Sequence, residues 1–315
     1  MKFHHHQVFL LVAIVDVVEG LAWRLRGISY SGGGRPEKGT AAAAAAAAVG
    51  VPAPWPLPKW VWSKAWRGHR RALPWLHRWD AAAPENTCVN LQVLWLKALA
   101  GDDIAYEMLP RQSRFVVSRP LRWLYPRLHH QNTLMRSRYL DAAVSRELEP
   151  NATLVTLGAG FCTRSLRFHA VRRIELDLPA VVAQKAKILE DRGFETTFSL
   201  VPANLSAPEG RETLRDALPR STRVVFVLEA LLVYLGDHSA HALLEAALDA
   251  ARAAGATSIS LCFADRLPDV PGVDESAVRA TLAKAGWHDL VDYLPKPGLA
   301  RHMGLARFRD PTNPT

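Results

Sequence analysis

Short apolar runs alternate with longer amphipathic stretches through the second half of the chain. Continuous apolar runs bounded by turn residues are typical of strands buried on both faces of a sheet. In chain order the expected strands cover residues 153–157, 173–177, 197–201, 223–228, 258–263, 289–294 and 303–308. The intervening stretches predict helices over residues 163–170, 179–192, 211–218, 237–254 (capped by Asp237) and 273–285. This alternation favours a parallel sheet with helices on both faces.

Three further helices are predicted ahead of the first strand. Leucine or valine recurs at helical spacing between Leu91 and Leu99, and Asp102 and Asp103 open a second, short helix. Residues 135–148 form the third, with three aliphatic side chains on one face. We therefore expect one compact domain over residues 86–315.

The first 85 residues have a different composition. Residues 1–50 combine a short apolar run, three consecutive glycines and eight consecutive alanines, which predicts a disordered low-complexity leader. The apolar run at residues 8–15 is shorter than the about 20 residues of a spanning helix. It is either a weak targeting signal or an unordered start with no address, so the location stays open between the cytoplasm and an organelle.

Residues 51–85 form a Trp/Pro-rich extension. Six of the ten tryptophans fall between Trp55 and Trp79, interleaved with lysines and arginines. This combination suits a membrane-surface helix, a surface that stacks on single-stranded nucleic acid, or indoles packed on the main domain. Five prolines break any long amphipathic helix and favour packing. A membrane-surface role remains an alternative for this extension alone.

The charge distribution argues against a nucleic-acid partner. The formal net charge is +9, yet residues 1–78 hold 11 of the 39 basic and only 3 of the 30 acidic side chains. A nucleic-acid enzyme would carry its basic surface on the folded domain. The cysteines, Cys88, Cys162 and Cys262, lie far apart, so neither a disulfide framework nor a metal site is predicted.

Polar or glycine residues follow each of the first four predicted strands, at the edge where α/β sheets bind ligands. In strand order they are Gly158 and Gly160, then Asp177, then Asn204 and Leu205, and finally Glu229. Glycines allow a close backbone approach to a ligand, and an acid about twenty residues further on suits a ribose. Each residue alone also fits a turn or a helix cap. Thr163 replaces the third glycine of a dinucleotide fingerprint, which argues against an NAD(P)-dependent oxidoreductase.

Three segments resemble the leucine carboxyl methyltransferase family. Leu157-Gly-Ala-Gly-Phe-Cys-Thr-Arg164 is similar to its LGAG-x-DTR signature. Glu175-Leu-Asp-Leu-Pro179 with Lys185 is similar to its E-V-D-x-P pattern, and Glu229-Ala-Leu-Leu-Val-Tyr-Leu235 to its E-x-x-L-x-Y-L pattern. Weaker matches lie at residues 100–103 and 136–141, and the resemblance extends from about residue 86 to the C-terminus.

The resemblance implies a Rossmann-like class I methyltransferase fold with S-adenosylmethionine as cofactor. Such a fold has a seven-stranded, mostly parallel sheet with helices on both faces, here preceded by an N-terminal helical segment. Carried over by position, Arg136 (or Arg138) would pair with the methionine carboxylate of the cofactor, and Glu229 would face its ammonium group. Gly158 would let the backbone approach the cofactor, and Asp177 would hold the ribose hydroxyls. Asn204 and Leu205 would bind the adenine.

The predicted activity is that of an S-adenosylmethionine-dependent O-methyltransferase acting on a carboxylate, either a protein C-terminal leucine or a small-molecule acid. A carboxylate acceptor is already ionised and needs no base, which suits a sequence with no evident His–Asp pair. A small-molecule hydroxyl is the alternative acceptor, and His238 and His241 are candidate bases by proximity only. Cys162 and Asn204 stand where the family usually has aspartate, so a cofactor-binding protein with weakened turnover also remains. No catalytic residue is assigned.

Overall fold

The computed structural model describes residues 85–99, 101–109, 114, 127–169, 171–270, 272–296 and 301–308. The predicted leader and, apart from residue 85, the Trp/Pro-rich extension lie outside the described residues, so those predictions stay predictions. The described residues up to Leu134 belong to one compact unit, and those from Met135 onward belong to a second.

The first unit contains α4 (Glu85–Leu99), α5 (Asp103–Met108) and the start of α8 (Arg127–Glu147). The Asp102 side chain caps α5 as predicted, because its Oδ1 accepts a hydrogen bond from the Ala105 amide at 2.9 Å. Helices α4 and α5 pack against one another, and Leu94 and Met108 are fully buried. Among the residues that the structure covers, no helix has both the length and the apolar character to cross a membrane.

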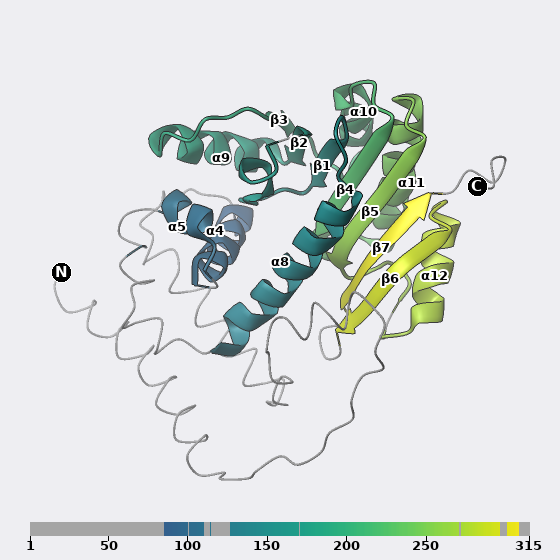
Figure 1. The fold of residues 1–315 in the computed structure, drawn as a ribbon. Helices are drawn as coiled ribbons and strands as arrows, with labels where there is room; N and C mark the ends of the chain where they lie inside the picture. The colour runs from purple at the N-terminus through teal and green to yellow at the C-terminus, as the bar shows by residue number, and fades with distance from the viewer. Residues whose placement is uncertain are drawn as a thin grey trace, which may run out of the picture. The chain divides into compact units, whose positions relative to one another are not determined.

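The second unit is built on one sheet of seven strands, all of them predicted (Figure 1). The strands are β1 (Thr153–Leu157), β2 (Arg172–Asp177), β3 (Ser199–Pro202), β4 (Arg223–Glu229), β5 (Ser258–Asp265), β6 (Asp289–Lys296) and β7 (Arg301–Phe308). Their order is β3-β2-β1-β4-β5-β7-β6, with β7 antiparallel to both of its neighbours. The strand order reverses between β1 and β4, so a ligand is expected at the carboxyl ends of these two strands.

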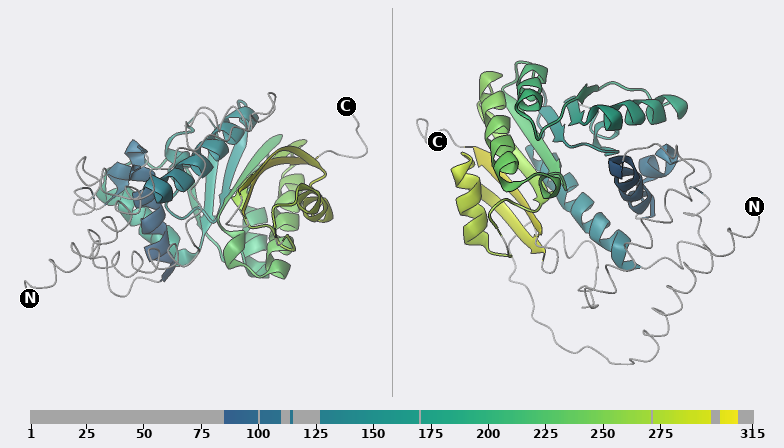
Figure 2. Two further views of the ribbon diagram at one scale, coloured as in Figure 1. Left: turned by 90° about the horizontal axis from the view of Figure 1, so that it is seen from below. Right: turned by 180° about the vertical axis from the view of Figure 1, so that it is seen from behind.

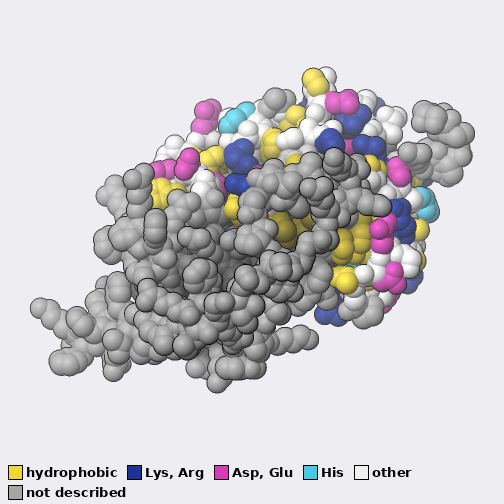
Figure 3. Space-filling view, turned by 60° about the horizontal axis from the view of Figure 1, so that its bottom comes forward, with side chains coloured by type: hydrophobic (Ala, Val, Ile, Leu, Met, Phe, Trp, Pro, Cys, Tyr) yellow, Lys and Arg dark blue, Asp and Glu magenta, His cyan; other side chains and the backbone are white. Residues whose placement is uncertain are grey.

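Helices cover both faces of the sheet (Figures 1 and 2). On one face, Leu140 and Val144 of α8 pack on Val225 and Cys262. On the other face, α10 (Pro208–Ala217), α11 (Asp237–Ala253) and α12 (Glu275–Lys284) pack on the alternate strand residues. Helix α9 (Pro179–Asp191) lies on the same face as α8. Ile174 and Leu176 of β2 point toward α10, α11 and α12, so Glu175 between them points to the other face, where Lys185 of α9 bonds it. On the face drawn in Figure 3 the described acidic and basic side chains are interspersed.

Some helix boundaries differ from the sequence prediction. The helix expected over residues 163–170 is only a 3-10 turn, η1 (Arg164–Leu166), because all three of its residues turn into the interior. Helix α8 begins eight residues earlier than predicted. Asp237 is the first residue of α11 rather than its cap, since Gly236 occupies the cap position.

Candidate functional site

A tight glycine turn follows β1. Gly158 and Gly160 have φ values of +64° and +51°, in the left-handed region that favours glycine. A Cβ added to Gly158 would lie 2.8 Å from the Leu231 side chain, so space as well as conformation requires glycine at this position. The turn is tied to β2 by the Ala159 amide, which donates to the Leu176 carbonyl at 3.1 Å.

Asp177 lies directly beside this turn. Its Oδ2 accepts a hydrogen bond from the Gly160 amide at 2.6 Å, and its Oδ1 accepts one from the Leu178 amide at 2.7 Å. Burial raises the pKa of the Asp177 carboxyl, although these two amides oppose the shift. The glycine turn and the acid expected at the end of the second strand are therefore in contact, and both line a shallow crevice together with Val182 and Lys185 of α9.

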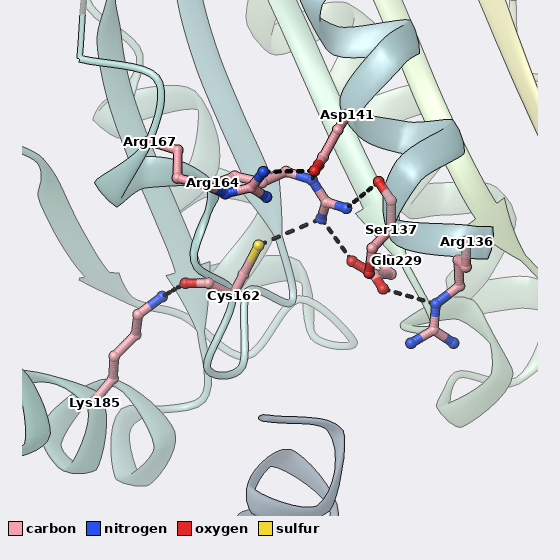
Figure 4. Close-up of polar contacts among 8 residues, drawn as sticks. All are labelled: Arg136, Ser137, Asp141, Cys162, Arg164, Arg167, Lys185 and Glu229. Carbon is pink, nitrogen blue, oxygen red and sulfur yellow. Dashed lines mark hydrogen bonds and ion pairs between the residues drawn. The ribbon is translucent and has the colours of Figure 1, made fainter. Parts of the chain in front are cut away.

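A buried lysine forms a hydrogen bond to the backbone just after the glycine turn. Lys185 of α9 donates to the Cys162 carbonyl at 2.6 Å (Figure 4). The same ammonium group also bonds the Glu175 carboxylate. The side chains of Lys185 and Glu175 are each 1% exposed, so this ion pair is inside the protein. Both residues lie in a sequence motif that resembles the family pattern, but the resemblance gave neither of them a role.

Arg164 lies at the centre of a cluster of five charged residues, the Arg164 cluster, which consists of Arg136, Asp141, Arg164, Arg167 and Glu229 (Figure 4). Glu229, at the end of β4, accepts from Arg136 Nε at 2.7 Å and from Arg164 Nη1 at 2.6 Å. Arg164 Nε donates to Asp141 at 2.7 Å, and Arg167 donates to the other oxygen of Asp141 at 2.6 Å. The completely buried Arg164 guanidinium thus connects α8, the glycine turn and β4.

The electrostatics of this cluster keep Arg164 and Asp141 charged. Burial lowers the pKa of the Arg164 guanidinium, but the neighbouring Cys162, Glu229 and Asp141 outweigh burial and leave the pKa above its usual value. Burial likewise raises the pKa of Asp141, yet Arg164 and Arg167 hold it below its usual value. A carboxylate at the end of β4 is therefore held in place by a partner that stays positive.

The structure brings most of the sequence-predicted residues to this edge of the sheet. Arg136 and Glu229 contact each other, whereas Arg138 is exposed on α8, so Arg136 is the one of the two predicted arginines that contacts Glu229. The Cys162 thiol lies 3.4 Å from Arg164 Nη1. The ion pairs of the buried Arg164 were not anticipated, and the signal for them in the sequence was the arginine that ends the glycine-rich motif.

Asn204 and Leu205 follow β3 but face different surroundings. Asn204 is exposed, and its Oδ1 accepts from the amide and the hydroxyl of Ser206 at 3.2 and 2.7 Å. The Leu205 side chain is buried in the core beside α10. The assignment of Asn204 and Leu205 to the adenine stays a prediction.

A His–Asp pair is present that the sequence did not reveal. His241 Nε2 lies 2.7 Å from Asp269 Oδ2, joining α11 to the loop after β5. The other ring nitrogen, Nδ1, is buried and has no hydrogen-bond partner in the described part of the chain. This pair therefore offers no exposed nitrogen to a substrate, and His238 is an exposed residue of the same helix.

Comparison with known proteins agrees with the family resemblance seen in the sequence. The sequence model of the leucine carboxyl methyltransferase family matches residues 95–248, a stretch that contains all six predicted cofactor residues. The match covers just under half of the chain, and it is to the family that the sequence motifs indicated. The chain is an S-adenosylmethionine-dependent methyltransferase, and S-adenosylmethionine is its cofactor.

Solved structures of methyltransferases are similar in fold at low sequence identity. A protein from Nostoc punctiforme, provisionally described as an O-methyltransferase, is 10% identical with a TM-score of 0.42, over 71% of this chain and 72% of that one. The N-methyltransferase NodS from Bradyrhizobium japonicum is 16% identical with a TM-score of 0.37, over 56% and 94% of the two chains. No curated protein sequence matches the chain. The strand order of the sheet in this chain is itself that of a Rossmann-like fold, with the reversal between β1 and β4.

Proposed function

We propose that this methyltransferase esterifies a carboxylate oxygen, either of a protein C-terminal leucine or of a small-molecule acid. The observation that carries the proposal is the joint placement of Asp177 and Glu229 around the glycine turn, inside the segment matched to a carboxyl methyltransferase family.

Asp177 and the residues around it would hold the nucleoside. The Gly160 and Leu178 amides orient the Asp177 carboxylate, and its remaining lone pairs suit the hydroxyl donors of a ribose. Gly158 has no side chain to block the backbone. Asn204 offers an exposed amide and Leu205 a backbone amide to an adenine edge.

Arg136 and Glu229 would hold the amino-acid end. A cationic arginine beside an anionic glutamate complements a zwitterion that carries one carboxylate and one ammonium group. Figure 4 shows the terminal nitrogens of Arg136 turned away from Glu229, where they are oriented to bind an anion. Arg164 holds Glu229 from its buried side, so Glu229 keeps its position when a ligand contacts Arg136.

The acceptor chemistry supports a carboxylate. When bound, the cofactor supplies an electrophilic methyl group on a sulfonium, and the electron pair of the broken S–CH₃ bond returns to sulfur as the O–CH₃ bond forms. A carboxylate attacks without losing a proton, so the protein needs only to align the partners and exclude water. A hydroxyl acceptor would need a base, and the buried Nδ1 of His241 does not favour one.

The test uses the full chain with S-adenosylmethionine labelled in its methyl group. Acceptors are a peptide that ends in leucine, the same peptide with a C-terminal amide, and a panel of small acids and alcohols. A methyl ester releases volatile methanol in alkali, whereas an ether does not. We expect alkali-labile label on the free-acid peptide or a small acid, and none on the amide.

Two variants and a control complete the experiment. Asp177→Ala and Glu229→Ala should lose cofactor binding, whereas Asp191→Ala, which removes an exposed carboxylate from the end of α9, should keep it. Alkali-stable label would contradict the carboxylate acceptor. Tight binding without transfer to any acceptor would instead favour a cofactor-binding protein with weakened turnover.

A further inference from the structure

A buried carboxylate terminates β5 and binds a loop from the neighbouring strand. Asp265 is fully buried, and its Oδ2 accepts hydrogen bonds from the successive amides of Leu231 and Leu232, the latter at 2.7 Å. Its Oδ1 accepts from the Val233 amide at 3.2 Å and from the Arg266 amide at 2.7 Å. One carboxylate therefore fixes three consecutive amides of the segment that follows Glu229.

That segment begins with a strained residue. Ala230 has a φ of +55°, the left-handed region that a residue with a side chain rarely adopts. Such a conformation persists only where the surrounding structure holds it. The Ala230 amide donates to the Ala264 carbonyl at 3.1 Å, and the next three amides donate to the Asp265 side chain. The last two residues of β5 therefore restrain both Ala230 and the segment that follows it.

The segment reaches the glycine turn through Leu231. The Leu231 side chain occupies the space where a Cβ on Gly158 would lie, at 2.8 to 3.0 Å from that position. The segment also starts one residue after Glu229. Its position therefore sets both the packing behind the glycine turn and the direction in which the chain leaves Glu229.

We propose that Asp265 is a positioning residue of the cofactor site, acting through residues 230–233 on Glu229 and Gly158. The inference rests on the proposed cofactor contacts of those two residues. The negative charge is essential to the role, because the four hydrogen bonds described above are donated by backbone amides to a carboxylate, which carries no donor of its own. An asparagine would place an NH₂ group against these donors and lose part of the set.

The first experiment compares Asp265→Asn with Glu147→Gln in the full chain. Glu147 is a matched control, because it is also a buried carboxylate that contacts β5, through Ser260 at 2.7 Å, but toward the opposite end of the strand. Both variants should lower the urea midpoint of unfolding. We expect Asp265→Asn to weaken S-adenosylmethionine binding about tenfold, as for the loss of one charge-assisted hydrogen bond, and Glu147→Gln to leave it within about twofold. Equal effects of the two variants on binding would overturn the inference.

The second experiment needs no cofactor. Amide hydrogen exchange over residues 229–235 should accelerate in Asp265→Asn and stay unchanged in Glu147→Gln. Unchanged protection in Asp265→Asn overturns the inference, whereas failure of the wild-type chain to bind S-adenosylmethionine counts against the proposed function instead. If Asp265→Asn does not fold, Leu231→Ala tests the same connection from the loop side. It should weaken cofactor binding at little cost in stability, and unaltered binding in that variant also overturns the inference.

Discussion

Replacing Arg164 with lysine tests whether the Arg164 cluster depends on the shape of the guanidinium or only on its charge. Arg164 bonds Glu229 through Nη1 and Asp141 through Nε, at 2.6 and 2.7 Å. A lysine keeps the positive charge but presents a single ammonium group, which cannot reproduce the planar fork. Arg164→Lys should therefore keep one of the two carboxylate contacts and lose the other.

The magnitude follows from burial. The Arg164 side chain is 0% exposed, and those of Glu229 and Asp141 are 9% and 24% exposed. A hydrogen bond to a charged group contributes about 1.5–3 kcal/mol, so losing one at this buried position should lower the free energy of unfolding by about 2–3 kcal/mol. This is a large fraction of the about 5–15 kcal/mol that stabilises a protein domain.

Urea denaturation followed by tryptophan fluorescence measures the change. With a slope of about 2–3 kcal/mol/M, the midpoint should fall by about 1 M. Arg279→Lys is the control, since Arg279 pairs with Glu275 on an exposed helix face and its contribution should be below about 0.5 kcal/mol. The reasoning is wrong if Arg164→Lys unfolds within about 0.5 kcal/mol of the wild type, or if both variants lose the same amount.

Further predictions concern the loop after β3, the pH dependence of stability and the strained residue after β4. A Cβ at Gly210 would lie 2.0 Å from the Asn204 carbonyl oxygen. Gly210→Ala should therefore lower the free energy of unfolding by about 1–3 kcal/mol and lower the melting temperature. Gly236→Ala is the control, because no atom lies within 4 Å of a Cβ added there. Burial raises the pKa of the Glu147 carboxyl, but hydrogen bonds from its arginine and serine partners outweigh burial and leave the pKa below the usual 4.5. A depressed carboxyl pKa contributes stability above pH 4.5, and that contribution is lost as the pH falls through the folded-state pKa. The stability difference between wild type and Glu147→Gln should therefore shrink as the pH is lowered below 4.5. A constant difference would contradict this. Ala230→Gly should leave the unfolding free energy unchanged or raise it by up to about 1 kcal/mol, because relief of strain offsets the added freedom of the unfolded chain; a loss above about 1 kcal/mol would show that Ala230 is not strained.

The strands of the sheet were predictable because their signal is local. Each apolar run is long enough for one buried strand, and all seven runs became strands within two or three residues of the predicted bounds. The helix expected over residues 163–170 failed for the opposite reason. Arg164 turns inward to partners 23 and 65 positions away, and these contacts outweigh local helix preference.

The candidate site divides in the same way. The sequence by itself determined the glycine turn, the acid at Asp177 and the acid at Glu229, since each follows an apolar run and parallel strands end at one edge of the sheet. The motifs around them also indicated the family whose sequence model matches residues 95–248.

Only the tertiary structure decided the partners of these residues. Arg136 meets Glu229 across 93 positions of the chain, and Asp265 binds amides 32 to 34 positions before it. Hydrophobic periodicity specifies which residues are buried and in which element, because it repeats along the chain. Which arginine contacts which carboxylate depends on strand register and on helix packing across the sheet, and no local stretch of the sequence specifies either of these.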